Sequence, residues 1–226
     1  MNRSIIRLVI IICGVFLLQI TMLGARTDGD ESKDRAALSK LQQVALAMHL
    51  FHGSHDSFPA HASYKNGKAL LSWRVHLLPF LGEKALYEQF RLDEAWDSPH
   101  NKKLIAKTPK VYSDSLDEVD KSGKTRFLAP LGLPNVFTGK PTGVRSSDIT
   151  DGLGKTVIVV EVTAERAVVW TKPDDLAVDT TEPATGLLEE GKDSFNVALA
   201  DGRARRIPKT TLSKELRAMF TCNGSD

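Results

Sequence analysis

The chain has 226 residues, of which 42% are apolar and 26% are charged, and its composition is typical of an ordinary globular protein with one modest core. Its formal net charge of +2 is matched by two arginines near the N-terminus, Arg3 and Arg7, so the rest of the chain is neutral. A strongly basic surface is therefore excluded, and the sequence predicts no nucleic-acid partner.

An uncharged apolar run, residues 8–23, follows this short basic head and predicts contact with a membrane. Basic residues precede the run and acidic residues follow it, which places the N-terminus in the cytoplasm and the remaining chain outside. The run is slightly shorter than the ~20 residues of a typical spanning helix, and Gly24-Ala25 offers a signal-peptidase site. We therefore expect residues 1–25 to form a single-pass membrane anchor. The alternative is a secreted or periplasmic protein after cleavage near Ala25.

Residues 26–33 are rich in glycine and aspartate and predict a flexible linker, followed by one extracytoplasmic domain at 34–226. Within 36–52, apolar residues recur at steps of three and four, so one side of a long helix is expected to face a core. Gly53 is the expected end of this helix, because glycine adopts the left-handed conformation without steric cost.

Short helices are expected in the next part of the chain. Ser72 is a predicted cap for a helix that Pro79 ends or kinks, because proline has no amide hydrogen to donate. Another short helix is expected at 83–90. A third is expected after Ser98-Pro99, where a cap residue precedes a proline.

The second half of the chain favours strands. Residues 156–163 and 166–170 are β-branched runs separated by only two residues, which predicts a hairpin. A second hairpin is expected at Asp201-Gly202, between 195–200 and 203–207, because both residues tolerate a tight turn. The expected fold class is therefore α+β, with a membrane segment followed by a long helix packed on an antiparallel sheet. Short helices, including one at 210–220, and long loops at 113–124, 129–147 and 171–193 complete it.

A histidine series near the end of the long helix is the first candidate site. His49 and His52 are three residues apart, so they could share a metal ion, with His55 or Asp56 completing the site. However, the expected break at Gly53 separates His55 from the pair, and the glutamate of helical zinc motifs is missing. We therefore expect His49 and His52 to be structural or interaction residues, and predict neither a bound metal nor another cofactor. A metal-dependent enzyme that uses the pair is the weaker alternative.

Residues 152–156, GLGKT, are similar to the end of a phosphate-binding loop. The full motif needs a glycine five positions before Gly154, where this chain has Ile149, and a helix after the Lys-Thr pair. A strand is expected there instead. The sequence therefore predicts a turn that leads into a strand, and no nucleotide partner.

Three tryptophans, Trp73, Trp96 and Trp170, are the remaining candidates, because together they could form a platform for sugars or other ligands. Aromatic side chains so far apart in sequence are more often core residues, since each buries a large area. The sequence contains no nucleophile-elbow motif, and neighbours such as Ser54 and His55 do not make a catalytic triad. The chain is therefore not expected to be an enzyme.

Four stretches occur in an order that carries a family resemblance: LQQVALAMHLFHGSHDSFPA, LSWRVHLLPFLGEKALYEQFRLDEAWDSPHN, SDITDGLGKTVIVVE and FNVALADGRARRI. Over roughly 38–207, the chain resembles the planctomycete-type family of pseudopilin-like domains of unknown function, which is also filed under a bacterial solute-binding label. The second stretch, which contains Trp73, Trp96 and Asp97, is the most specific. The resemblance implies a prepilin-type segment, then a helix packed on an antiparallel sheet, with no established catalytic residues. His49 and His52 match the family's helix-end histidine pair, and Asp201-Gly202 matches its C-terminal hairpin.

The chain also departs from that family. Members open with a glycine and a phenylalanine around a cleavage point and a glutamate early in the apolar run, and residues 1–25 have neither that pair nor any glutamate. Residues 111–114 replace a cysteine-containing segment, and residues 191–194 replace a His-Pro-Gly-Gly stretch. We therefore expect a non-enzymatic domain that does not polymerise and serves in envelope organisation or protein interaction. Its expected partners are the membrane, through residues 8–23, and other envelope proteins or glycans. A solute- or glycan-binding module is the alternative.

Overall fold

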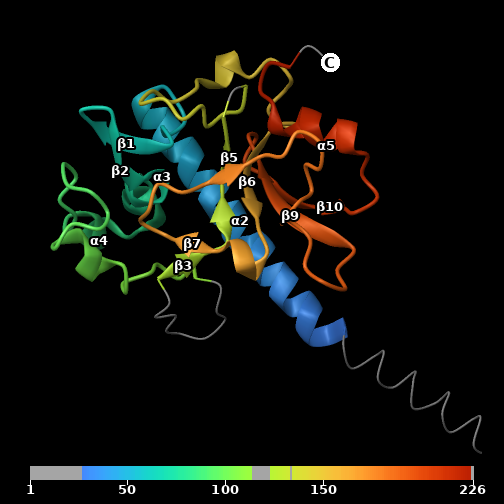
Figure 1. Ribbon diagram of the computed structural model, residues 1–226, viewed down its shortest axis with the longest axis horizontal. Coiled ribbons are helices and arrows are strands. Elements are labelled where there is room, and N and C mark those ends of the chain that lie inside the picture. The colour runs from blue at the N-terminus through green and yellow to red at the C-terminus, as the bar shows by residue number, and fades with distance from the viewer. Residues whose placement is uncertain (1–26, 114–122, 133, 225–226) are drawn as a thin grey trace, which may run out of the picture. The chain divides into compact units, whose positions relative to one another are not determined.

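The computed structural model (Figure 1) describes three stretches of the chain: 27–113, 123–132 and 134–224. The chain divides into two units, residues 1–36 and 37–226. In the first unit the described residues form the first turns of helix α2 (Thr27–His55). The membrane segment expected at 1–25 lies outside the described residues. Within the described stretches, no helix is both long enough and apolar enough to cross a membrane.

Helix α2 begins earlier and ends later than the sequence predicts. The flexible linker expected at 26–33 is wrong from Thr27 onward, where the chain is helical, and Glu31 pairs with Arg35 one turn later at 3.2 Å. Gly53 lies inside the helix instead of ending it. Asp56, directly after the helix, takes the left-handed conformation with φ of 57°. Aspartate is one of the few residues besides glycine that adopts it at low cost, so the reversal occurs three residues later than expected.

The domain at 37–226 is built on a four-stranded antiparallel sheet with the order β10-β9-β6-β4. Its strands are β4 (Phe127–Leu128), β6 (Val157–Glu161), β9 (Ser194–Leu199) and β10 (Ala204–Pro208). Strand β9, one of the two inner strands, alternates in side-chain type. Phe195 and Val197 belong to one buried cluster, while Ala198 belongs to the other, with Ala200 just beyond the strand. Successive residues of a strand point to opposite faces, so each face of the sheet has its own core.

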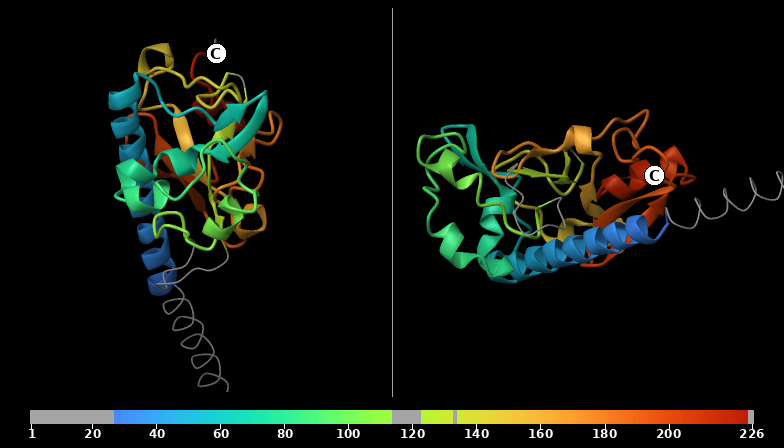
Figure 2. Two further views of the ribbon diagram at one scale, coloured as in Figure 1. Left: turned by 90° about the vertical axis from the view of Figure 1, so that its left-hand side faces the viewer. Right: turned by 90° about the horizontal axis from the view of Figure 1, so that it is seen from below.

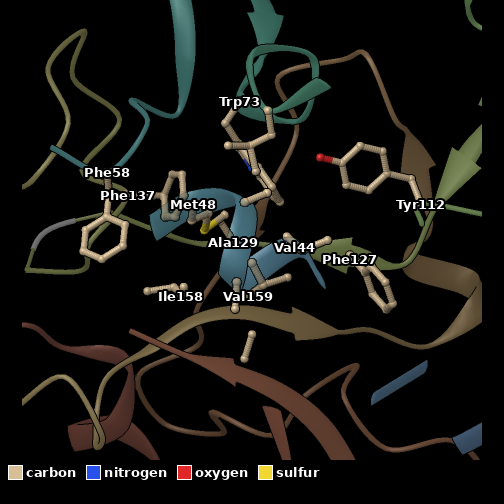
Figure 3. Packing of buried hydrophobic residues seen from close by; sticks show 14 of the residues in the cluster. Val44, Met48, Phe58, Trp73, Tyr112, Phe127, Ala129, Phe137, Ile158 and Val159 are labelled. Atoms are coloured by element: carbon tan, nitrogen blue, oxygen red, sulfur yellow. The ribbon is translucent and has the colours of Figure 1, made fainter. Parts of the chain in front are cut away.

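Each face of the sheet packs against a helix. On one face, Val44 and Met48 of α2 lie against Ile158 and Val159 of β6 (Figure 3). These two successive residues join the same cluster because the register of β6 shifts between Val157 and Val159. On the other face, the apolar side of α5 (Ser213–Phe220) joins the second buried cluster. Figure 2 shows the part of α2 from residue 37 onward along one side of the domain, with α5 on the other side of the sheet. The structure thus confirms a long helix packed on an antiparallel sheet, and also the expected closing helix.

Of the two predicted hairpins, the structure confirms one. Strands β9 and β10 pair around Asp201-Gly202, and Gly202 has a φ of 89°. The hairpin expected from β6 to the next strand is wrong, because β7 (Val168–Val169) pairs with β3 (Lys124–Thr125). The 3-10 turn η4 (Ala164–Arg166) redirects the chain after β6, which pairs with β4 and β9 instead.

The short helices follow local rules. The Ser72 side chain accepts a hydrogen bond from the Arg74 backbone N–H and caps α3 (Trp73–His76), as expected. Pro79 lies in the first turn of η1 (Leu78–Leu81), so α3 ends before it. The helix expected after Ser98-Pro99 is only a single 3-10 turn, η2. The remaining short elements are β1 (Ala62–Lys65), β2 (Lys68–Ser72), α4 (Lys84–Tyr87), η2 (Asn101–Leu104), β5 (Pro130–Leu131), η3 (Ser146–Asp148) and β8 (Leu176–Ala177).

Candidate functional site: the histidine junction of helix α2

Helix α2 meets the turn between β9 and β10 at a junction formed by Gln42, His49 and Gly202. The Gln42 side-chain oxygen accepts a hydrogen bond from the Ala204 backbone N–H at 3.0 Å, and its amide nitrogen donates to the Gly202 carbonyl. A Cβ atom at Gly202 would lie 3.2 Å from the His49 ring carbon Cδ2. Gly202 is therefore required both for its positive φ and for this close approach. The structure thus brings together His49 and the Asp201-Gly202 turn, which are far apart in sequence.

His49 presents an unusual nitrogen at this junction. Its ring meets the edge of Phe58, with 5.6 Å between ring centroids. Within the described part of the chain, its Nε2 atom is buried and has no hydrogen-bond partner. A buried polar atom without a partner costs free energy, so this position is held by packing around the ring and not by a bond.

His52 links α2 to η3. Its Nε2 accepts a hydrogen bond from the Ser146 backbone N–H at 3.2 Å, and its ring lies 5.2 Å from Phe58 between centroids. An N–H group can only donate, so Nε2 acts as the acceptor and is not available to a metal ion in this arrangement. The role of His52 that the structure shows is therefore to anchor a loop.

His55 turns away from the pair, for a reason other than the predicted break at Gly53. Each residue advances about 100° around a helix, so the directions of His49 and His55, six residues apart, differ by about 120°. The His55 ring stacks on Phe51, with 4.0 Å between centroids, and its Nδ1 lies 3.0 Å from the Phe51 carbonyl oxygen. Across the described residues, no group of three or more His, Cys, Asp or Glu side chains could hold a metal ion.

Asp201 is held by Arg203, two residues later. The Arg203 guanidinium donates from Nε to Asp201 Oδ2 at 2.7 Å, and its backbone N–H donates to Oδ1 at 3.0 Å. Partial burial acts to raise the pKa of Asp201, but the hydrogen bonds and charge of Arg203 outweigh it and lower the pKa. A Cβ at Gly154 would lie 2.9 Å from both Asp201 Oδ2 and the Arg203 guanidinium. Gly154, the second glycine of GLGKT, therefore leaves room for this pair. Strand β6 follows GLGKT as predicted.

The core position that the sequence favoured for the tryptophans is confirmed for two of the three. Trp73 and Trp170 are fully buried, and Tyr112 packs between them. The centroid of the Tyr112 ring lies 6.3 Å from that of Trp73 and 6.0 Å from that of Trp170. Trp96 is only partly buried; its backbone N–H donates to Leu70 of β2, and Lys172 lies over its ring at 5.6 Å. Asp97, next to it, is exposed. These two candidates thus lie beside β2.

A buried ion pair between Arg74 and Asp175 was not predicted. The Arg74 Nη2 atom lies 2.6 Å from Asp175 Oδ1, and both side chains are 0% exposed. Asp175 also accepts hydrogen bonds from Trp73 Nε1 at 3.0 Å and from the Ala129 backbone N–H at 2.8 Å. Burial raises the pKa of Asp175, and the charge of Arg74 opposes that rise. The only sequence signal was a charged residue, Arg74, inside the apolar stretch SWRVH.

A family model described as a protein of unknown function (DUF1559) matches residues 38–130, which run from α2 to β5. The match includes His49, His52 and Arg74 but ends before β6, β9 and the Asp201-Gly202 turn. No curated protein and no solved structure matches the chain.

Proposed function

We propose that this chain is a non-enzymatic, membrane-anchored domain outside the cytoplasm that serves in envelope organisation or protein interaction, as its resemblance to pseudopilin-like domains implies. The observation that carries the proposal is the junction at His52, where a side chain with catalytic potential is used to tie α2 to η3. Residues 8–23 would supply the membrane anchor.

Other reactive side chains are also engaged in the fold. Asp201 is bound by Arg203, and Asp175 is bound by Arg74 in the interior. The Cys222 thiol donates to the Pro134 carbonyl, and burial raises its pKa, with the nearby Asp151 carboxylate adding to that rise. A thiol with a raised pKa stays protonated and is a poor nucleophile. These contacts support an interaction role over catalysis.

The surface of α2 offers a contact for another envelope protein. Leu46 and Leu50 are 57% and 50% exposed and lie one turn apart on the helix, next to the exposed and uncharged Gln43. Side chains four residues apart share one face of a helix, so the two leucines form one apolar contact.

Photo-crosslinking in native membranes tests the interaction. A photoreactive residue at Leu46 of the full chain should crosslink one defined protein, and the same residue at the exposed Lys214 of α5 should not. The change Leu50→Glu should abolish the crosslink, because it places a charge in the same contact. Equal labelling from both positions, or capture of lipid alone at Leu46, would contradict the proposal.

Protease accessibility tests the orientation. Protease added to intact spheroplasts should digest the domain at 37–226, because the basic residues lie before the apolar run. Complete protection of the domain until the membrane is opened would show that the chain faces the cytoplasm.

A further inference from the structure

A cleft of about 250 Å³ lies between the loop at 134–144 and the C-terminal tail, beside η3. Six of its ten lining residues have polar or charged side chains, which supply both donors and acceptors. These polar and charged lining residues are Asn135, Thr138, Lys140, Thr142, Asp148 and Asn223.

The walls of the cleft are held by bonds to the rest of the domain. The Cys222 backbone N–H donates to the Pro134 carbonyl at 2.9 Å, and the Thr150 N–H donates to the Cys222 carbonyl at 2.8 Å. On the other side, the Phe58 N–H donates to the Val144 carbonyl at 2.8 Å. The cleft is thus formed before any ligand arrives, which lowers the entropy cost of binding.

Asn135 gives the cleft a fixed polar group. This residue is only 7% exposed, and its backbone N–H donates to the Gly132 carbonyl. Its side chain lines the cleft, and its amide makes no hydrogen bond to another described residue, so the amide is open to a ligand. A ligand that both donates and accepts can bond to this amide in place of water.

Side chains of both charge signs lie around the cleft, so its lining matches no single ionic ligand. Lys140 lines it on one side and Asp148 on the other. The hydrogen bonds from Arg145 lower the pKa of Asp148, so this carboxylate is ionised at neutral pH. A hydroxyl group can accept a hydrogen bond from Lys140 and donate one to Asp148, so it suits a cleft that carries both signs of charge.

We propose that this cleft binds a small, neutral, polyhydroxylated ligand, the size of one sugar ring, through Asn135, Thr138 and Thr142. Sugar hydroxyls both donate and accept, as do an amide and a threonine hydroxyl. The Thr138 hydroxyl oxygen accepts from the Lys140 backbone N–H, which leaves its hydrogen free to donate. The volume lies below the ~300–1,000 Å³ of drug-sized pockets, so the ligand is small. This site goes beyond the proposed interaction role.

Ligand-detected NMR by saturation transfer can test the site with the full chain, held in a detergent whose headgroup is not a sugar. The probes are glucose, galactose and N-acetylglucosamine, a chito-oligosaccharide that carries the last of these at its end, and inorganic phosphate. We expect at least one sugar to bind with a Kd on the order of 1 mM. Binding of the free sugar indicates a solute site, and binding of the oligosaccharide alone indicates a glycan end.

Two variants locate the binding. Thr142→Val, which keeps the side-chain shape, and Asn135→Ala should each weaken it about five- to tenfold, the effect of one lost hydrogen bond. Thr181→Val, at an exposed threonine outside the cleft, should leave it unchanged. If Asn135→Ala does not fold, Thr142→Val alone decides. Saturation transfer from no sugar, binding of phosphate alone, or an unchanged Kd in Thr142→Val would overturn the proposal.

Discussion

The imidazole Nε2 of His52 accepts a hydrogen bond from the backbone N–H of Ser146 at 3.2 Å, across 94 residues of sequence. This bond joins the end of α2 to the first residue of η3, and the last residue of η3, Asp148, lines the cleft beside the C-terminal tail. The end of the helix and one wall of the cleft therefore depend on each other for their positions.

The change His52→Ala should lower the free energy of unfolding by about 1–3 kcal/mol, because it leaves the Ser146 N–H unpaired and removes the contact with Phe58. His55→Ala is the matched control, since His55 is exposed and bonds only within its own helix. Urea unfolding of the two variants measures the difference. Equal losses in both would show that the bond to η3 contributes nothing.

The change Asp175→Asn should lower the free energy of unfolding by about 3–5 kcal/mol, because it leaves the buried Arg74 charge without its counter-charge. Asp174→Asn, one residue away, removes only a partly exposed pair with Lys172 and should cost less than about 1 kcal/mol. Thermal and urea unfolding distinguish the two. A small effect of Asp175→Asn would mean that the Ser72 hydroxyl and the carbonyls of Phe127 and Asp174 satisfy Arg74 without the carboxylate.

The folded domain should lose stability as the pH is lowered, because of His76. Burial, with the charge of His55 adding to it, lowers the pKa of His76 from 6.5 to about 4. Between these values the unfolded chain binds a proton that the folded chain does not, so the free energy of unfolding falls as the pH falls through this window. The loss from this group is about 3 kcal/mol at most.

The matched variant for this effect is His76→Leu, which has no titratable side chain at that position. Urea unfolding across the window should show a smaller dependence on pH for the variant than for the unchanged chain. The two curves would run parallel if His76 were protonated in the folded domain as easily as in the unfolded chain.

Residues 26–226 expressed alone should be folded, soluble and mostly monomeric by light scattering, because this fragment keeps all of α2 and both faces of the sheet covered. The full chain should stay with membranes through residues 8–23. The absence of any glutamate in residues 1–25 leads us to expect no filament. Filaments that contain the protein, or its processing by a prepilin peptidase, would contradict this.

Local features of the fold could be predicted from the sequence. The Ser72 cap, the end of α3 before Pro79 and the turn at Asp201-Gly202 all depend on backbone preferences over a few residues. The apolar stripe of α2 also identified the helix face that packs on the sheet, since a period near 3.6 residues needs no knowledge of the partner.

The tertiary structure decided the features that depend on distant partners. The sequence determined that 166–170 favours a strand, but only the folded chain decided that β7 pairs with β3, because a strand edge accepts any neighbour that reaches it. The Arg74–Asp175 pair joins residues 101 apart, and no local pattern marks Asp175 as buried. His49 and His52 were found from their spacing, whereas their partners, Gly202 and Ser146, come from loops that the fold brings to α2. Local conformation follows from the preferences of neighbouring residues, whereas the burial of a side chain depends on which distant segments pack against it.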